Sequence, residues 1–234
     1  MKLLSRIILI VPLLILSHPV SSQSLDRETV LERVIHAYGG EENLRKLDSV
    51  VQEWGFVALM GNRHGTDIRS IRIPGQLKVE LRYPDKTETR LLNGDTGRVI
   101  FNGGVAQIAA QRQTDAMRLQ LMRLYSPLVL RDRSESIKLV VDGDFCALTL
   151  VENGVQADYL VNQETWRIEK VVGALKINGA EMRFLTEYSD FKFVDGVLVH
   201  QKENKFAGNV NTAKLLLRQI TFDAGLDDAS FLPE

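Results

Sequence analysis

Few residues in this sequence have the types and the spacing that catalysis or metal binding requires. The single cysteine, Cys146, lies in the strand-like run 145–150, which favours a buried structural thiol. Histidines occur at positions 18, 36, 64 and 200, far apart in the sequence, and the alternation of His200 with Val199 places its side chain on the outer face of a strand. No G-x-S-x-G, Walker, H-E-x-x-H or C-x-x-C motif occurs. We therefore expect no catalytic residue, no metal site and no cofactor.

The charged residues are balanced in number and interleaved in sequence. Lys and Arg together number 29 and Asp and Glu 30, a net charge of −1, whereas a nucleic-acid-binding protein normally has a basic surplus. Basic and acidic residues alternate along 67–90, which predicts a solvated sheet face: Arg69, Arg72, Lys78, Arg82, Lys86 and Arg90 with Asp67, Glu80, Asp85 and Glu88. A catalytic carboxylate pair at a barrel mouth stays open as an alternative, because sequence spacing does not show which carboxylates meet.

The apolar residues of the central segment form a clearer pattern. In residues 113–125, Met117, Leu121 and Leu124 recur at i, i+4 and i+7, and this spacing predicts an amphipathic helix that ends at Pro127. Two interpretations remain open for this helix. It either packs on a sheet as part of the core, or it forms a lid over an apolar cavity, where methionine suits adaptable contacts.

The elements around this helix are mostly strands. Residues 25–38 and 41–47 have helical spacing, and from residue 50 the period changes to two, with hairpin turns between short runs. We expect a mainly β protein with helices (α+β), containing about ten or eleven antiparallel strands, one leading helix and the central helix. A single sheet of that size curls into a barrel or half-barrel.

The first residues of the 234-residue chain have the layout of a secretory signal peptide. Lys2 and Arg6 precede an apolar run over 7–16, and small residues follow before Gln23. The apolar run is shorter than the ~20 residues that span a bilayer. We expect residues 1–22 to be a cleaved signal peptide and residues 23–234 to be a single exported domain, soluble in the periplasm, with no transmembrane segment.

Turn and strand-edge signatures spread over most of the chain carry a family resemblance. They are Tyr38-Gly39-Gly40, Leu44-Arg45-Lys46-Leu47, Ile73-Pro74-Gly75, Leu77-Lys78-Val79-Glu80, Tyr83-Pro84-Asp85, Leu92-Asn93-Gly94-Asp95-Thr96-Gly97, Thr186-Glu187-Tyr188-Ser189-Asp190-Phe191 and Val194-Asp195-Gly196-Val197. With these signatures the chain resembles the bacterial lipoprotein-carrier superfamily of the LolA and LolB type, and within it the exported proteins described as outer-membrane lipoprotein-sorting-like.

The resemblance implies an open, curved antiparallel half-barrel, a helical lid, and an apolar cavity that shields acyl chains. It also implies a basic residue near the cavity mouth that takes part in lid closure, and Arg72 is the closest positional match. The chain departs from the carriers after the 95–97 turn, where Arg98-Val99-Ile100-Phe101 contains no tryptophan.

Together these observations predict an exported, non-enzymatic protein that holds a lipid or an acylated lipoprotein in an apolar cavity, with a role in lipid or lipoprotein transport to the outer membrane. The alternative is a cell-envelope interaction module whose core is filled by its own side chains and which binds an envelope protein. The expected cavity and lid residues are Leu77, Val79, Leu81, Tyr83, Met117, Leu121, Leu124, Trp166, Ile168, Met182 and Phe184.

Overall fold

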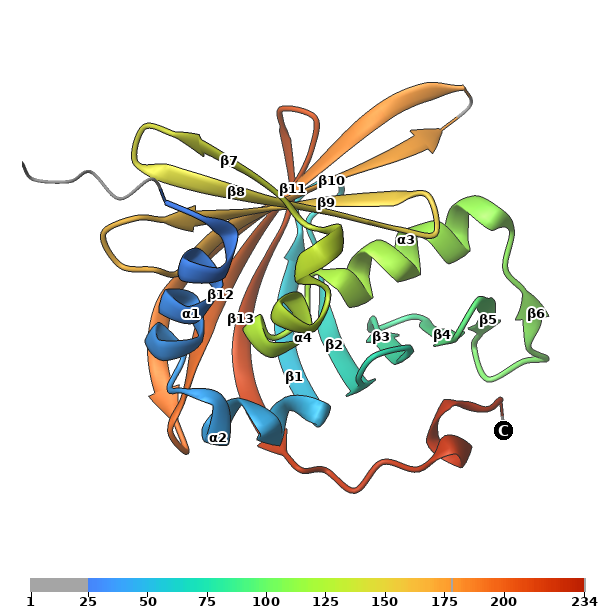
Figure 1. Ribbon diagram of the computed structural model, residues 1–234. Coiled ribbons are helices and arrows are strands. Elements are labelled where there is room, and N and C mark those ends of the chain that lie inside the picture. Colours follow the sequence, from blue (N-terminus) through green and yellow to red (C-terminus); the bar gives the residue numbers. More distant parts are fainter. Residues whose placement is uncertain (1–24, 178, 234) are drawn as a thin grey trace, which may run out of the picture.

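The computed structural model describes residues 25–177 and 179–233, so the expected signal peptide lies outside the described residues. One antiparallel sheet of thirteen strands forms the molecule, in the order β6-β5-β4-β3-β2-β1-β13-β12-β11-β10-β9-β8-β7 (Figure 1). Its two end strands, β6 and β7, do not pair with each other, so the sheet is an open half-barrel rather than a closed barrel. This confirms the predicted fold class, with more strands than the ten or eleven expected.

The strands are β1 (Ser49–Ala58), β2 (Arg63–Arg72), β3 (Gln76–Arg82), β4 (Thr87–Asn93), β5 (Thr96–Phe101), β6 (Gln107–Ile108), β7 (Lys138–Asp142), β8 (Phe145–Glu152), β9 (Val155–Asn162), β10 (Ile168–Ile177), β11 (Ala180–Val194), β12 (Val197–Ala207) and β13 (Val210–Phe222). Sequence-adjacent strands pair as hairpins. The pairing of β1 with β13 joins the two meanders into one sheet.

Turn chemistry sets the hairpins. Asn153 and Gly154 between β8 and β9, and Asp195 and Gly196 between β11 and β12, all have positive φ, which these residue types tolerate well. The strands alternate buried and half-buried residues; β9, for example, buries every second residue from Val155 onward. The alternation of side chains therefore gives much of the sheet one buried face and one face that is partly exposed to solvent.

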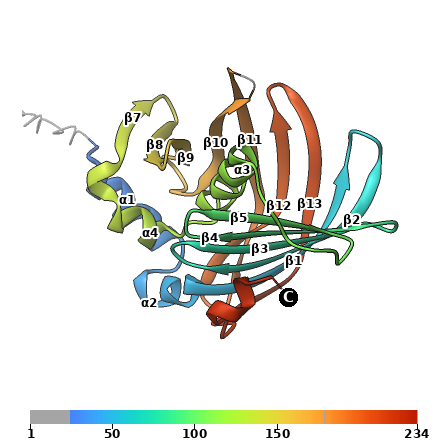
Figure 2. The same ribbon diagram turned by 90° about the vertical axis from the view of Figure 1, so that its right-hand side faces the viewer.

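Four α-helices lie on the inside of the curved sheet or at one end of it: α1 (Arg27–Ala37), α2 (Glu41–Leu44), α3 (Gln111–Met122) and α4 (Pro127–Asp132). The carboxylate of Asp26 caps α1 by accepting a hydrogen bond from the Thr29 backbone N–H, at 2.7 Å. In Figure 2 the strands wrap around α3, which contacts β3, β4 and β5 on one side and β9 and β10 on the other. The helix α1 packs against α4.

Two glycines allow α3 to approach the sheet closely. A Cβ at Gly173 on β10 would lie 2.3 Å from a methyl carbon of Leu119, and a Cβ at Gly97 on β5 would lie 2.5 Å from the hydroxyl of Thr114. Both distances are shorter than van der Waals contact. The absence of side chains at these positions therefore lets the helix lie deep in the concavity, between the two arms of the sheet.

The central helical segment differs from the sequence prediction in one respect. The expected helix over 113–125 ends at Met122, and Pro127 begins the separate helix α4 instead of ending α3. Proline suits the first position of a helix because it lacks only an N–H that would have no helical partner there. The hydroxyl of Ser126 caps α4 by accepting from the Val129 N–H. Residues 123–126 thus form a short connection between α3 and α4.

Candidate binding cavity and buried ion cluster

A cavity of about 90 Å³ lies between the concave face of the sheet and the α3–α4 connection. Its lining comes from Tyr38 at the C-cap of α1, the 3₁₀ turn Arg45–Asp48, the connection, the start of α4, and strands β1 and β9–β13. The lining residues are Tyr38, Leu47, Gln52, Arg123, Leu124, Tyr125, Ser126, Pro127, Tyr159, Ile168, Val171, Tyr188, Val197, Leu198, Val199, His200 and Ile220. Most of these side chains are apolar, and a few polar groups are placed among them, as is usual for small-molecule sites.

Tyrosines from the sheet hold the end of α3 above the cavity. The hydroxyl of Tyr159 donates to the Met122 carbonyl at 2.8 Å, and that of Tyr188 donates to the Arg123 carbonyl at 3.3 Å. The last carbonyls of a helix have no partner within the helix, so these bonds satisfy groups that burial would otherwise leave unpaired. Burial raises the pKa of both tyrosines, which keeps the hydroxyls in the neutral form that donates.

A second attachment ties the connection to the β8–β9 hairpin. The hydroxyl of Tyr125 donates to the Glu152 carboxylate at 2.7 Å, and Arg133 at the end of α4 pairs with the same carboxylate. The Arg133 guanidinium also lies over the Tyr125 ring, 4.9 Å from its centre. The cavity therefore has a roof that is fastened on both sides by identifiable polar contacts.

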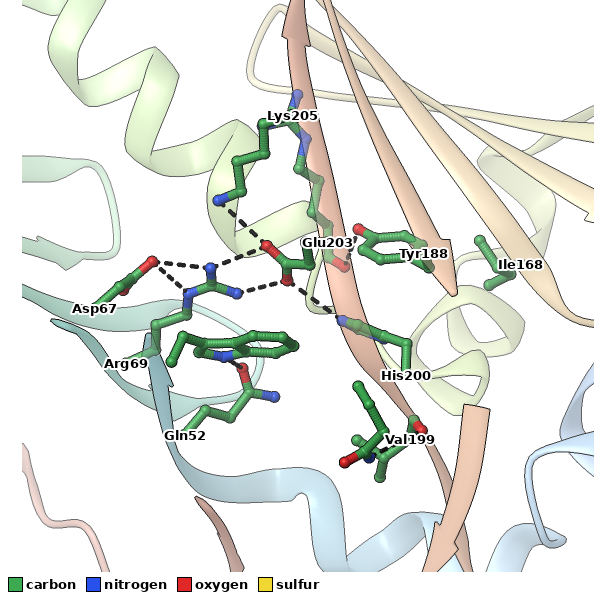
Figure 3. Close-up of polar contacts among 12 residues, drawn as sticks. Gln52, Asp67, Arg69, Ile168, Tyr188, Val199, His200, Glu203 and Lys205 are labelled. Atoms are coloured by element: carbon green, nitrogen blue, oxygen red, sulfur yellow. Dashed lines mark hydrogen bonds and ion pairs between the residues drawn. The ribbon is translucent and has the colours of Figure 1, made fainter. Parts of the chain in front are cut away.

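A buried ion cluster lies on the concave face beside the cavity (Figure 3); we define it as Asp67, Arg69, His200, Glu203 and Lys205. Arg69 is 1% exposed and donates to the Asp67 carboxylate at 2.9 Å and to both oxygens of Glu203 at 2.8 and 3.0 Å. The Lys205 ammonium lies 3.3 Å from Oε2 of Glu203, and His200 Nε2 lies 3.3 Å from Oε1 of the same carboxylate. Arg69 is thus shared between two carboxylates in the bidentate geometry that arginine favours.

The charges of the cluster act strongly on Glu203. Burial by itself would raise the pKa of this carboxyl, but the attraction of Arg69 and Lys205 and the hydrogen bond with His200 hold the pKa well below its usual range. Glu203 is therefore ionised in the folded protein at neutral pH. The cluster therefore places paired charges inside the concavity, beside the cavity.

Aromatic rings connect the ion cluster to the cavity. The His200 ring stacks on Trp54 with centroids 5.5 Å apart and lies 4.3 Å from the Tyr188 ring. Trp54 Nε1 donates to the Gln52 side-chain oxygen at 3.0 Å, and the Arg69 guanidinium lies 5.0 Å from the Trp54 ring centre. Gln52, Tyr188 and His200 line the cavity themselves, so the ion cluster and the cavity are continuous.

Two sequence predictions about these side chains are wrong. The alternation of charges predicts a solvated face for Asp67 and Arg69, yet both are almost fully buried. The alternation with Val199 predicts that His200 faces outward, yet it lines the cavity. Val197, Leu198 and Val199 are all buried, so both faces of β12 are covered at this point and alternation does not separate inside from outside.

The predicted cavity and lid residues fall into four groups: residues that line the cavity, core residues, partly buried residues and exposed residues. Leu124 and Ile168 line the cavity, whereas Leu77, Val79, Met117 and Leu121 lie in the main core. Leu81, Trp166 and Phe184 pack partly buried against that core, and Tyr83 packs edge-on against Phe56. Met182 is 41% exposed, and Arg72 pairs with Asp228 at 2.8 Å with both side chains exposed.

Sequence reasoning missed the polar part of the lining: Gln52, Arg123, Tyr188 and His200. One signal in the sequence could have indicated this polar lining. Asp67 and Arg69 carry opposite charges, and they lie on the same face of β2 as the next inward residue, Ile71. Charged side chains on the same face as a core isoleucine are either exposed to solvent or paired with opposite charges in the interior. Sequence alone does not choose between these outcomes.

The described residues offer little for covalent or metal chemistry. In residues 25–177 and 179–233, no group of three or more His, Cys, Asp or Glu side chains is arranged to hold a metal ion. Burial raises the pKa of the Cys146 thiol, which disfavours the reactive thiolate. The cavity is suited to binding a ligand away from water, because most of its lining is apolar and the ion cluster lies beside it. Over the same residues, no helix is long and apolar enough to cross a membrane.

The fold is similar to three solved structures. A LolA superfamily protein from Nitrosomonas europaea aligns with TM-score 0.58 and 13% identity over 89% of this chain and 98% of its own. An outer-membrane lipoprotein-sorting protein domain from Vibrio parahaemolyticus aligns with TM-score 0.52 and 11% identity over 88% and 97%. A DUF1329 family protein from Desulfovibrio piger aligns with TM-score 0.53 and 9% identity over 88% and 96%.

Comparison at the level of sequence adds nothing to this likeness, since no protein-family model and no curated protein matches the chain. The likeness therefore rests on how the elements are arranged over most of each chain. It includes the open curved sheet that the sequence resemblance implied. This protein has the fold of the LolA superfamily and of the lipoprotein-sorting proteins that share it.

Proposed function

We propose that this protein is an exported, non-enzymatic carrier that holds a lipid or an acylated partner in the cavity beneath the α3–α4 connection. The observation that carries the proposal is the lining of that cavity. It gathers apolar side chains from β10, β12 and β13 under a roof formed by Leu124 and its neighbours. Burial of an acyl chain against such a wall contributes about 0.8 kcal/mol per CH₂.

The volume of the cavity sets a condition on this function. At about 90 Å³ it is smaller than the ~150 Å³ engineered cavity that holds one benzene. An acyl chain therefore enters only when the roof moves, and the arrangement with the roof fastened is the closed state. The connection at 123–126 is short. Tyr159 and Tyr188 donate to the Met122 and Arg123 carbonyls where it begins, and its own Tyr125 donates to Glu152. Burial of ten CH₂ groups contributes about 8 kcal/mol in gross terms. This exceeds the ~3–6 kcal/mol of two neutral hydrogen bonds and one to the Glu152 carboxylate.

The first experiment is native mass spectrometry of the exported, purified protein, with lipid extraction of the same sample. A bound mass that releases fatty acid or phospholipid supports the carrier and identifies its cargo class. A protein that is free of lipid and stays so when lipids are added overturns the proposal.

A pair of variants tests whether the cavity itself is the site. Val171→Phe fills space in the lining, and Val99→Phe makes the same change in the core on β5, away from the cavity. Both variants carry an overpacking cost of about 1–3 kcal/mol. We expect Val171→Phe to weaken binding of a fluorescent fatty acid at least tenfold and Val99→Phe to leave binding within twofold. Equal effects of the two variants would place the site elsewhere.

One observation favours a second function, an envelope interaction module. The apolar side of α3 fills much of the concavity with its own side chains, including Met117, Leu119 and Leu121, each at most 3% exposed. A half-barrel filled in this way needs no ligand. The lipid-extraction experiment separates the two functions, because only the carrier retains lipid.

A further inference from the structure

Buried polar atoms without a partner gather beside the cavity. Among the described residues, Asp67 Oδ1, Arg123 Nε and Thr186 Oγ1 are buried and have no hydrogen-bond partner. Asp67 belongs to the ion cluster, and Thr186 pairs with Lys205 of that cluster across the β11–β12 ladder. Buried polar groups are nearly always satisfied, so the two unsatisfied donors, Arg123 Nε and Thr186 Oγ1, indicate that an acceptor binds there.

Together with the neighbouring Arg123, the ion cluster has a surplus of positive charge. Its two carboxylates, Asp67 and Glu203, both bind Arg69, and Glu203 is further engaged by Lys205. Arg123 is a third cation close enough to interact electrostatically with Glu203 and Arg69, and burial lowers its pKa. Three cations thus face two carboxylates, with His200 as the remaining titratable group.

Arg123 is the cation best placed to meet a ligand. It lines the cavity, at the point where α3 ends, and its Nη2 donates to the Phe184 carbonyl at 2.9 Å, which fixes the direction of the guanidinium toward β11. Within the described part of the chain its Nε has no acceptor. Thr186 follows two residues after Phe184 on the same strand, so its hydroxyl lies on the same face as the Phe184 side chain.

We propose that the ligand is an amphiphile with one acidic group, a carboxylate or a phosphate ester, whose anion pairs with Arg123 and accepts from Thr186 while its chain lies on the apolar wall. This inference rests on the proposed carrier function. A neutral lipid leaves the donors and the surplus cation unmatched, whereas one anion satisfies the donors and balances the charge. Arg69 hydrogen-bonds to two carboxylates, whereas Arg123 donates to the Phe184 carbonyl and its Nε has no acceptor among the described residues. This difference separates a structural arginine from a ligand-binding one.

The test compares ligands that differ only in the head group. Displacement of a fluorescent fatty acid from the wild-type protein is measured with dodecanoate, dodecyl phosphate and dodecanol at pH 7.5, and inorganic phosphate is titrated separately. A hydrogen-bonded charge pair corresponds to about a tenfold to hundredfold preference for an acid over the alcohol. The ratio between dodecanoate and dodecyl phosphate identifies which acid the site prefers.

Variants then assign the preference to a residue. We expect Arg123→Gln to reduce the preference for acids to less than threefold while binding of dodecanol stays within twofold, and Arg123→Lys to retain part of it. Arg82→Gln, which removes an exposed arginine that pairs with Glu80 and does not line the cavity, is the matched control and keeps the preference.

The outcomes distinguish this inference from the function on which it rests. Equal binding of acid and alcohol by the wild-type protein overturns the inference and leaves the carrier function intact. Binding of none of the amphiphiles overturns the carrier function. Binding of inorganic phosphate alone, without competition from the amphiphiles, overturns the inference in favour of a free anion.

Discussion

Replacement of Glu203 with glutamine removes the carboxylate that Arg69, Lys205 and His200 share. Glu203 is 2% exposed, and Arg69 is more deeply buried still. Removing one member of a buried ion pair costs about 3–5 kcal/mol, because the remaining charge is left without compensation in a medium that solvates it poorly. Arg69 keeps Asp67 as a partner and the amide oxygen still accepts a hydrogen bond, so we expect a loss near the lower end, about 3 kcal/mol.

The loss is measured by urea unfolding and by thermal melting of purified protein. For a domain of this size, about 2–4 °C in Tm accompanies each kcal/mol, so Glu203→Gln is expected to lower Tm by roughly 6–12 °C. Asp228→Asn is the matched control, since its ion pair with Arg72 has a similar distance of 2.8 Å but exposed side chains. Such surface pairs contribute about 0–1 kcal/mol.

The pH dependence provides an independent check on the cause. Because the pKa of Glu203 in the folded protein lies below its unfolded value, its contribution is fully present above about pH 4.5 and is lost as the pH falls toward the folded pKa. The glutamine variant lacks this titration, so its stability should fall less steeply below pH 4.5 than that of the wild type. A loss below about 1 kcal/mol with an unchanged acid slope would refute a stabilising role for the Glu203 charge in the ion cluster.

Three further perturbations test the placement of α3. Tyr159→Phe leaves the buried Met122 carbonyl without its donor and should cost about 1–3 kcal/mol in urea unfolding, while a loss under about 0.5 kcal/mol would show that this bond does not hold the helix end. Gly173→Ala brings a Cβ to 2.3 Å from Leu119, so an overpacking loss of about 1–3 kcal/mol is expected, and the double variant with Leu119→Ala should recover part of it. Leu121→Ala, at a position 2% exposed, should cost about 2–5 kcal/mol; a smaller loss together with weaker lipid binding would identify Leu121 as a lid residue rather than core.

Local patterns in the sequence predicted most of the elements. The helical spacing over 25–38 corresponds to α1, and the Asp195-Gly196 turn joins β11 to β12. The shortest strand, β6, has two residues, too few for a period to be recognised. The amphipathic pattern of α3 is present in the sequence, but the helix ends at Met122, earlier than the pattern predicts. There the hydroxyl of Tyr159 on the sheet donates to the Met122 carbonyl.

The candidate site was much less predictable than the elements that carry it. Leu124 and Leu121 have the same place in the amphipathic pattern, yet Leu124 lines the cavity and Leu121 lies in the core. The difference depends on where α3 ends and on how far Gly173 lets it approach the sheet, and neither follows from the helical period. Charge alternation likewise left open whether Arg69, in the alternating run, is solvated or paired in the interior, and the structure buries it.

The sequence by itself determined the antiparallel meanders, the leading helix and the amphipathic central helix, because turn residues and side-chain periodicity act between residues close in the chain. Only the tertiary structure decided that Arg69 meets Glu203, which lies 134 residues away in sequence. Their strands are separated by β1 and β13, about 14 Å of sheet, and the concave curvature together with the length of the arginine side chain closes that distance. The alternation of side chains along a strand shows which residues share a face. Which face becomes the interior depends on the pairing of β1 with β13 and on the position of α3 against the sheet.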